Sequence, residues 1–238
     1  MKSLRYLIIM PTFNEADNVQ IIIPEIFSTV SDNVDILIVD DNSPDGTSDI
    51  VANMQSVYSN LKLMTKTKDK GFAKAYISGF NYAMDNGYSY VIQMDADGSH
   101  QSKFLNEMIA ASGVNTYVIG SRWVDGGSVV NWTLKRKILS LGGNFYAQLM
   151  LKSKIKDITG GFKVIDVGLL KKMNVSSIAN KGYSFQIELM LRARDSGAKI
   201  IEVPIEFVER EHGVSKMSTS IVLEAMKYVT IVGFRRFF

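Results

Sequence analysis

Two aspartates separated by one residue follow an apolar run near the middle of the chain. The stretch 90–100 reads YVIQMDADGSH, and Asp95 and Asp97 come directly after its apolar part. Residues i and i+2 of an extended chain face the same side, so the two carboxylates can converge on one point. Burying them is costly unless a cation, hydrogen-bond donors or solvent meets them. Because Mg²⁺ prefers carboxylate oxygens and completes its shell with substrate phosphates, we favour a metal or phosphate role for this pair.

Polar side chains also end two earlier apolar runs. They are Thr12, Asn14, Glu15, Asp40 and Asp41. Ligands of open parallel sheets bind outside the carboxyl ends of the strands, so three such ends together are a more specific signal than any single pair. Helix caps and Asx-turns are the competing interpretation. The residues leave that alternative open for DDNSPDG, in which Asp45 and Gly46 suit a turn.

Strand and helix patterns alternate through the first half of the chain. Strands are expected at 6–13, 34–43, 61–67 and 90–100, and helices at 15–30, 45–58 and 72–87. Asn14 is a candidate cap for the first of these helices. Strands separated by helical stretches predict βαβ units and a mostly parallel sheet flanked by helices.

The alternation continues in the second half. Helices are expected near 102–113 and at 138–152, 184–197 and 221–238, strands at 116–123 and 198–210, a Gly-rich basic stretch at 125–137, and loops at 156–166 and 211–220. The chain has no visible internal repeat, low-complexity segment or linker. One α/β domain with a nucleotide-binding N-terminal half is therefore favoured.

Composition narrows the classes of function. The chain has 238 residues, no cysteine and a net charge of +3. The absence of cysteine excludes disulfides, thiolate metal sites and thiol nucleophiles, and it suits a cytosolic protein. The charge is too small to imply nucleic acid, so we expect no such partner. No uninterrupted apolar run reaches the ~18 residues of a membrane span, so any membrane contact is expected at the surface.

Five short motifs together resemble family-2 glycosyltransferases of the GT-A type. They are PTFNEADN, IVDDNSPDGT, MDADGSH, GSRW and FVEREHGVSK, and they run in this order from Pro11 to about Lys216. Within that family, the chain is most similar to dolichol- or polyprenol-phosphate mannose synthases. The resemblance implies a Rossmann-like GT-A fold, Mg²⁺ or Mn²⁺ as cofactor, and transfer of mannose from GDP-mannose to a polyprenyl phosphate of the dolichyl type. A UDP-glucose or other sugar-nucleotide donor, or a sugar-nucleotide-binding protein without turnover, are the alternatives.

By position in these motifs, the resemblance implies roles for the strand-end residues. The residues expected to bind the sugar nucleotide are Pro11, Thr12, Asn14, Glu15, Asp41, Asp95, Ala96, Asp97, Arg210 and Lys216. Asp95 and Asp97 would hold the metal and the diphosphate, and Asp40 would have a structural role. Ser99 stands where many relatives have a possible third ligand, and it would be a weaker one than a carboxylate. His100 is expected to be a surface residue.

Cations beyond residue 120 indicate a phosphate-bearing acceptor. Arginine forks bind phosphate bidentately, and lysine supplies a point charge. The resemblance implies that Arg122 and Arg136 grip the acceptor phosphate and act, with Asp97, in catalysis. It also implies that Arg210 and Lys216 hold the donor diphosphate or order the loop over it. Solvated surface charge is the competing interpretation, and it is the favoured one for neighbours such as Lys135 and Lys137.

Two further stretches resemble the family with the roles of their residues left open. DITGGFKV departs from the family's D-x-T-S-G-F-R at Gly160 and Lys163, and lysine lacks the guanidinium fork. Asp157 in this stretch either acts in the site or caps a turn. Glu188, in FQIE, either orients a cation or sugar hydroxyl or is a buried, paired glutamate.

The chemistry and the location follow from the acceptor. A phosphomonoester has a second pKa of about 6, so its oxygen can attack the anomeric carbon without a strong base. A single in-line displacement would invert the configuration and give a β-mannosyl phosphate. The helix 221–238 is apolar around most of its circumference and ends in Arg235, Arg236 and two phenylalanines, which suits a membrane interface. Packing on the sheet or on a partner subunit is the alternative for this helix and for 138–152.

These inferences divide the chain and locate it. We expect a glycosyltransferase domain over 1–217, with a nucleotide-binding half at 1–99 and an acceptor half at 100–217, followed by an amphipathic helix at 218–238. The expected location is cytoplasmic and peripheral, at the cytoplasmic face of a membrane. A homo-oligomer is compatible with the sequence.

Overall fold

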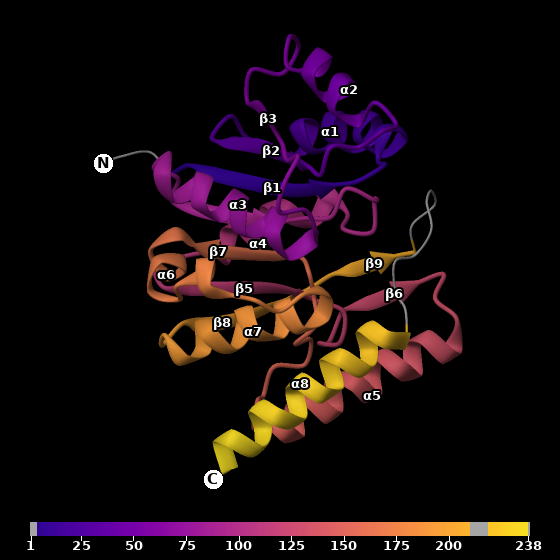
Figure 1. Ribbon diagram of the computed structural model, residues 1–238, viewed down its shortest axis with the longest axis vertical. Helices are drawn as coiled ribbons and strands as arrows, with labels where there is room; N and C mark the ends of the chain where they lie inside the picture. The colour runs from indigo at the N-terminus through magenta and orange to yellow at the C-terminus, as the bar shows by residue number, and fades with distance from the viewer. Residues whose placement is uncertain (1–3, 210–218, 238) are drawn as a thin grey trace.

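A seven-stranded sheet lies at the centre of the computed structural model, which describes residues 4–209 and 219–237 (Figure 1). Its strands are β1 (Tyr6–Thr12), β2 (Val34–Asp40), β3 (Leu61–Thr65), β4 (Tyr90–Gln93), β5 (Thr116–Ser121), β7 (Lys163–Asp166) and β8 (Lys199–Pro204). The order across the sheet is β3-β2-β1-β4-β7-β5-β8. Only β7 runs antiparallel to its neighbours, β4 and β5, so the prediction of a mostly parallel sheet is confirmed.

Helices cover both faces of this sheet. They are α1 (Ala16–Thr29), α2 (Thr47–Met54), α3 (Phe72–Asp85), α4 (Leu105–Ala110), α5 (Leu134–Leu151), α6 (Val167–Lys172), α7 (Gly182–Asp195) and α8 (Thr219–Phe237). Apolar residues of α1, α2 and α4 form one core with one face of the strands. Residues of α3, α5, α6, α7 and α8 form the core on the other face. The fold is thus the predicted α/β architecture, because the strands are apolar on both faces and each face needs a helical cover.

A second, two-stranded sheet pairs β6 (Ser128–Val130) with β9 (Glu206–Val208) in parallel. The prediction of one strand over 198–210 was wrong, because the chain leaves the main sheet at Ile205. The amide of Ile205 donates to Ser121 of the main sheet, and its carbonyl accepts from Ser128 of the small one. One buried residue, Ile205, therefore joins the two sheets. The alternation of side chains along 198–210 does not reveal that the chain passes from one sheet to the other.

Strand β7 lies in a segment that was predicted to be a loop. Its apolar part is only two residues long, and it begins with Lys163, which is fully buried. The ammonium group donates a hydrogen bond to Gln186 of α7 and lies 5.5 Å from the centre of the Tyr117 ring. Burial lowers the pKa of Lys163 to about 7. A lysine in this position gave no sequence signal for a central strand.

Helices α5 and α8 lie side by side at one edge of the molecule (Figure 1). The Tyr146 and Thr230 hydroxyls are 2.6 Å apart between them, and α8 also packs against α7. No helix in the described part of the chain has the length and apolarity needed to cross a bilayer. The division into 1–99, 100–217 and 218–238 stays a prediction.

Lys163→Met should change how stability depends on pH. Because the folded-state pKa lies below the ordinary value of 10.5, the unfolded chain binds the extra proton between about pH 7 and 10. Unfolding free energy of the wild type therefore gains a contribution as pH rises through this window, and the methionine variant lacks that gain.

Urea unfolding of both proteins from pH 6 to 10 measures the effect. The unfolding free energy of the variant minus that of wild type should be largest at pH 7 and below and should decrease toward pH 10. Lys199→Met, at an exposed residue of β8, is the matched control. A difference that stays constant with pH would contradict the assigned pKa.

Candidate active site

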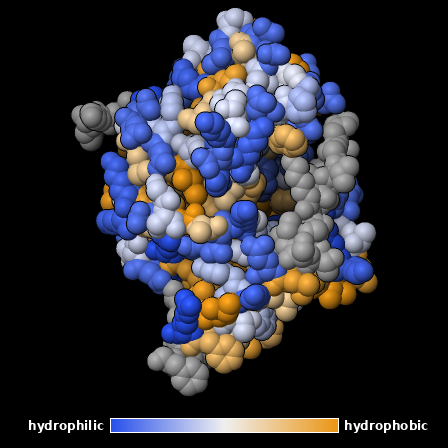
Figure 2. All heavy atoms as spheres, viewed as in Figure 1, coloured by the Kyte–Doolittle hydropathy of each residue, from blue (hydrophilic) through white to orange (hydrophobic). Residues whose placement is uncertain are grey.

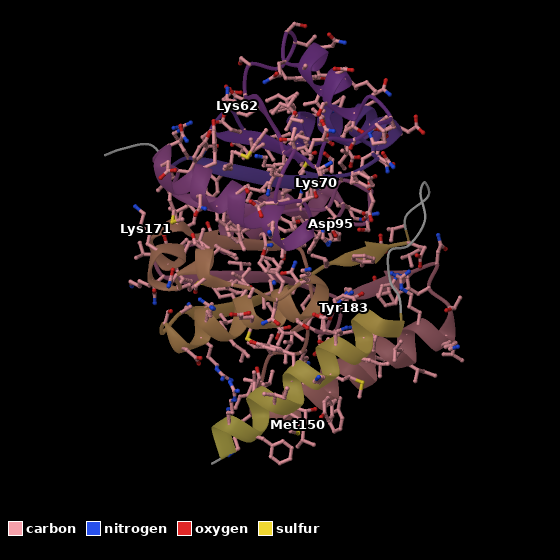
Figure 3. All side chains as sticks on the ribbon, in the orientation of Figure 1. Lys62, Lys70, Asp95, Met150, Lys171 and Tyr183 are labelled. Carbon is pink, nitrogen blue, oxygen red and sulfur yellow. The ribbon has the colours of Figure 1, made fainter. Side chains whose placement is uncertain are left out.

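The carboxyl ends of β2, β1 and β4 are adjacent in the sheet, as the sequence predicted. Asp40 ends β2, Thr12 ends β1, and Asp95 follows β4. In Figure 3, Asp95 and Tyr183 of α7 both lie near the middle of the molecule, with Tyr183 on the side toward α8. The acidic residues and the second half of the chain therefore face a common region.

Hydrogen bonds orient both aspartates of the MDADGSH motif. The buried Tyr76 hydroxyl donates to Asp95 Oδ1 over 3.0 Å. Ser99 donates to Asp97 Oδ1 twice, from its hydroxyl over 2.6 Å and from its backbone amide over 3.1 Å. Ser99 therefore holds Asp97 in place. Tyr76 is a supporting residue that the sequence analysis missed, because its helix lies nineteen positions upstream.

His100 is buried, with 2% exposure, so the expectation of a surface histidine was wrong. Its Nδ1 accepts the backbone amide of Asp95 over 2.9 Å, and its ring stacks on Phe162 at 5.0 Å. Burial lowers the pKa of His100, which keeps the ring neutral near pH 7. The imidazole thereby closes the turn that carries the two aspartates. The polar sequence of this turn did not indicate a buried histidine.

At the end of β2, the two neighbouring aspartates differ in role. Asp40 is fully buried and accepts hydrogen bonds from Thr12, Ser43 and Ser48, which agrees with its predicted structural role. Asp41 accepts the amide of Gly71 through Oδ2 over 2.6 Å, while its buried Oδ1 has no hydrogen-bond partner among the described residues. Asp41 is therefore the member of this pair that can still accept from a ligand.

The loop after β1 meets the loop after β2. Asn14 has a φ of 58°, and its amide donates to Ser43; it does not cap α1, so that prediction was wrong. Asp45 accepts the amides of Ala16 and Thr47, so it has the turn and capping role left open by the sequence. The remaining residues predicted to bind nucleotide at this edge are Pro11 and Glu15, and both are partly exposed.

Asp95 and Asp97 are chemically suited to a divalent cation. Both are carboxylates, and Ser99 and Tyr76 orient them. Within residues 4–209 and 219–237, no group of three or more acidic or histidine side chains is arranged to hold a metal. A cation here would therefore take its remaining ligands from phosphate oxygens and water, which is how Mg²⁺ is usually held beside a nucleotide.

Arg122 forms a buried ion pair with Asp157. Its Nε and Nη2 donate to the two carboxylate oxygens, each over 2.7 Å, and its backbone amide donates to Asp157 over 3.0 Å. Burial acts to lower the pKa of Arg122, but the Asp157 charge outweighs this and the pKa is raised. Asp157 is thus the partner of a predicted phosphate ligand, and Nη2 also donates to Thr159.

Aromatic rings surround the two arginines of the predicted acceptor site. The Arg122 guanidinium lies 5.4–5.8 Å from the centres of the Trp123, Trp132 and Phe207 rings. The Arg136 guanidinium lies 4.0 Å from the centre of the Trp132 ring, and its Nη1 pairs with Glu209 at the end of β9. Both cations are therefore held by flat apolar surfaces and a carboxylate.

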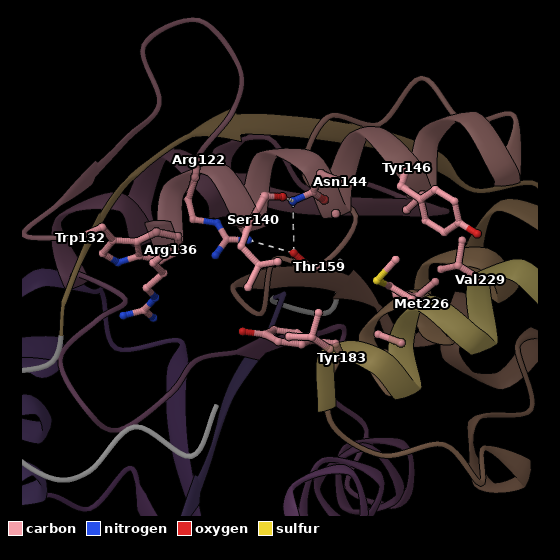
Figure 4. A pocket seen from close by; sticks show the side chains of 16 residues that line it. Arg122, Trp132, Arg136, Ser140, Asn144, Tyr146, Thr159, Tyr183, Met226 and Val229 are labelled. Atoms are coloured by element: carbon pink, nitrogen blue, oxygen red, sulfur yellow. Dashed lines mark hydrogen bonds between the residues drawn. The ribbon is translucent and has the colours of Figure 1, made fainter. Parts of the chain in front are cut away.

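A groove between α5, α7 and α8 begins at these arginines; we call it the arginine groove. It is lined by Arg122, Trp132, Arg136, Leu139, Ser140, Gly143, Asn144, Tyr146, Ala147, Thr159, Tyr183, Ile187, Val222, Ala225, Met226 and Val229. Figure 4 shows the two arginines and Trp132 at one end and Tyr146, Met226 and Val229 at the other. The groove is thus cationic at one end, has a few polar side chains such as Ser140 and Asn144 in its middle, and is mostly apolar beyond them.

A second hollow lies beside Asp97; we call it the Asp97 cavity. Its lining residues are Asn18, Ile21, Ile22, Glu25, Ala96, Asp97, Gly98, Gln101, Val208 and Glu209. Glu209 contributes to this wall and also pairs with Arg136 of the arginine groove. The two hollows are therefore neighbours at Glu209.

The model of the family described as Glycosyl transferase family 2 matches residues 7–173. The chain belongs to this family. Two relatives are each 40% identical to this glycosyltransferase. One is the undecaprenyl-phosphate mannosyltransferase of Micrococcus luteus, where the match covers 95% of this chain and 93% of the relative. The other is the polyprenol monophosphomannose synthase of Mycolicibacterium smegmatis, with 97% and 88% covered.

Solved structures show the fold of this glycosyltransferase. Glucosyl-3-phosphoglycerate synthase of Mycobacterium tuberculosis, in complex with Mn²⁺, UDP-glucose and phosphoglyceric acid, aligns with a TM-score of 0.68 at 15% identity, covering 98% of this chain and 80% of that one. The mannosyltransferase PcManGT of Pyrobaculum calidifontis, in complex with GDP-mannose and Mn²⁺, aligns with a TM-score of 0.60 at 15% identity, covering 97% and 70%. The predicted GT-A fold is confirmed.

The remaining predicted residues of the glycosyltransferase have different outcomes. Arg210 and Lys216 lie outside the described residues and stay predictions. Lys135 and Lys137 are exposed, as favoured for them. Glu188 accepts two hydrogen bonds from Arg192, so the paired alternative holds for it.

The sequence analysis missed Trp132 and Tyr183 of the arginine groove, and Glu209 of the Asp97 cavity, which pairs with Arg136. A tryptophan in the motif GGSVVNW was a visible signal, since an aromatic in a Gly-rich basic loop is unusual without a surface to pack on. Glu209 precedes the predicted ligand Arg210 and was included in its motif without a role of its own.

Asp157→Asn should destabilise the glycosyltransferase strongly. Arg122 is only 8% exposed, and removing its partner charge leaves an uncompensated buried guanidinium. Losses of about 3–5 kcal/mol are typical for one partner of a buried pair. Urea unfolding measures the loss, and Glu206→Gln, which removes a carboxylate from the exposed pair with Lys103, is the control and should lose at most about 1 kcal/mol. Equal losses in the two variants would contradict the role assigned to Asp157.

Proposed function

We propose that this glycosyltransferase transfers mannose from GDP-mannose to a polyprenyl phosphate, with inversion, at a membrane surface. The observation that carries the proposal is the arginine groove. Its cationic end suits a phosphate, and its apolar length suits a prenyl chain. A soluble phosphorylated acceptor would not need the apolar part.

The start of α5 strengthens the phosphate assignment. Lys135, Arg136 and Lys137 lie in its first turn, and Thr133 caps it by accepting the Arg136 amide. Cations are unfavourable at the positive end of a helix dipole, and anions are favourable there. Arg136, which is partly buried at this end, would therefore be stabilised by an anion bound beside it.

The donor would bind across the carboxyl ends of β1, β2 and β4. Asp41 has a carboxylate oxygen available, and its backbone amide donates to Thr12 at the end of β1. Pro11, Asn14 and Glu15 lie beside Thr12 in the chain and would complete this part of the site. Asp95, Ala96 and Asp97 would meet the diphosphate on the next strand. A divalent cation held by Asp95 and Asp97 would neutralise charge on the departing diphosphate.

The residues of the chain would bind the two substrates and position them for the reaction. Arg122 and Arg136 would hold the acceptor phosphate so that one oxygen faces the anomeric carbon of the donor. That oxygen forms the new bond to the carbon, and the bond to the nucleotide diphosphate breaks with its electron pair leaving on the diphosphate. Because a phosphomonoester is already largely ionised near pH 7, no side chain need remove a proton. One displacement inverts the configuration and gives the β-mannosyl phosphate.

The outer faces of α5 and α8 support contact with a membrane. Of the sixteen large apolar side chains that are most exposed in the described residues, ten belong to these two helices. They are Leu134, Ile138, Leu139, Leu141, Phe145, Leu149, Leu223, Met226, Ile231 and Phe234. Apolar residues gather at the lower edge of Figure 2, where these helices lie. A patch of this kind beside the groove would let a lipid enter from the cytoplasmic face of a membrane.

The names of the relatives support the acceptor and the sugar. Both 40%-identical relatives are named for mannose transfer to a polyprenyl phosphate. The donor base is the less supported part, because the fold neighbours carry GDP-mannose in one case and UDP-glucose in another. A UDP-sugar-dependent transferase to the same lipid is therefore the second candidate.

The donor test uses the purified protein with labelled GDP-mannose, GDP-glucose and UDP-glucose, each with polyprenyl phosphate and Mg²⁺ or Mn²⁺. Lipid-extractable label is expected from GDP-mannose. Label from UDP-glucose alone would overturn the mannose assignment and favour the second candidate. Absence of transfer from every donor would favour a binding protein without turnover.

Asp97→Ala should lower metal-dependent transfer by about 100-fold or more, because the cation loses one of its two protein ligands. The initial rate of transfer measures this at saturating donor, and circular dichroism checks that the variant is folded. Asp125→Asn, which alters an exposed aspartate in a loop, is the matched control and should keep wild-type rates. Retained activity in Asp97→Ala would refute its assigned role.

A further inference from the structure

Arg136 is bound to an internal anion. Its Nη1 donates to the Glu209 carboxylate, and the two side chains are 20% and 30% exposed. The arginine thus has a carboxylate at the groove end where the proposed function puts the acceptor phosphate. Two anions would compete for one guanidinium.

The arginine itself is held in place independently of that carboxylate. Its guanidinium lies 4.0 Å from the centre of the Trp132 ring, and its backbone amide donates to the Thr133 cap of α5. Glu209 is attached differently. Its backbone amide donates to Val130 of β6, which fixes the end of β9 but leaves the carboxylate on a side chain that can rotate. Exchange of anions would therefore move Glu209 more easily than Arg136.

The site also contains donors that Glu209 does not use. Arg136 Nε and Trp132 Nε1 are buried and have no hydrogen-bond partner among the described residues. A buried donor without a partner is costly, and the several oxygens of a phosphate offer acceptors for Trp132 Nε1 and for the guanidinium edge formed by Nε and Nη2. A carboxylate has only two oxygens. A phosphate therefore suits these donors better than the present partner.

Glu209 stands where the two hollows of the site meet. It lines the Asp97 cavity and pairs with Arg136 of the arginine groove. It is thus the carboxylate between the proposed donor and acceptor sites. No role for it follows from the transfer chemistry itself, since the acceptor phosphate needs no base.

We propose that Glu209 is a positioning residue that holds Arg136 ready and is displaced when the acceptor phosphate binds. This inference rests on the proposed function. Its consequence is that the carboxylate weakens acceptor binding, since phosphate must break an existing ion pair. Glu209→Gln keeps the shape of the side chain and removes the competing charge.

The protein carries its own reporter for this exchange. It has two tryptophans, Trp123 and Trp132, whose rings contact each other beside Arg122 and Arg136. Intrinsic tryptophan fluorescence therefore reports on this end of the groove. Farnesyl phosphate, without donor, is the probe, and a detergent-matched titration gives its dissociation constant.

Glu209→Gln is expected to bind farnesyl phosphate about two- to fivefold more tightly than wild type, the range set by a partly exposed ion pair. The KM for polyprenyl phosphate should fall by a similar factor while the KM for the sugar nucleotide stays unchanged. Glu209→Asp should keep the wild-type constants, and Glu209→Ala gives a second neutral variant. Glu206→Gln, three residues away on β9 and in an exposed pair with Lys103, is the matched control and should change neither constant.

Three results would overturn the inference, and they separate it from the proposed function. Equal or weaker binding by both neutral variants, with normal binding by wild type and weakened binding by Arg136→Gln, would refute the role of Glu209 alone. A fall in the KM for the sugar nucleotide as large as that for the lipid would refute it as well. Failure of wild type to bind farnesyl phosphate would refute both the inference and the proposed acceptor.

Discussion

The buried pair of Arg122 and Asp157 is the contact on which the arrangement of the site depends. Asp157 takes three hydrogen bonds from Arg122, including one from its backbone, so the end of β5 and the loop before β7 are fixed to each other. Aromatic rings from three segments then pack around the neutralised guanidinium. Without the aspartate, the buried charge of Arg122 would be uncompensated and would disrupt the packing of these rings. With the aspartate, Arg122 can both hold the surrounding segments together and line the arginine groove.

Negative and positive side chains lie in different parts of the site. Carboxylates gather at the ends of β1, β2 and β4, where they would repel a diphosphate unless a cation came with it. One arginine and two lysines lie at the start of α5, where the helix dipole adds to their positive potential. Under the proposed function, the cation-assisted diphosphate and the acceptor phosphate would each meet the charge that suits it.

The sequence predicted the fold and the row of polar residues at the strand ends, because both rest on local patterns. Apolar strands and helices alternate regularly, and Asp95 and Asp97 follow one of those strands. The misses are contacts between distant residues. The burial of His100 depends on Phe162 and Phe207, the strand at Lys163 depends on Gln186 across the core, and the departure of β9 depends on the two sheets that Ile205 joins. None of these partners can be read from spacing, because each is supplied by the tertiary fold.

The length of the arginine groove limits what it can recognise. Along α5 the lining runs from Arg136 to Ala147, which at about 1.5 Å per residue is roughly 16 Å. Under the proposed function, that length accommodates the phosphate and the first few isoprene units, and the rest of the chain stays in the bilayer. Such a protein would recognise the phosphate and the first isoprene units of its lipid and would not discriminate between longer and shorter chains. Which polyprenol it uses in a cell would then be set by the composition of the membrane that its apolar helices rest on.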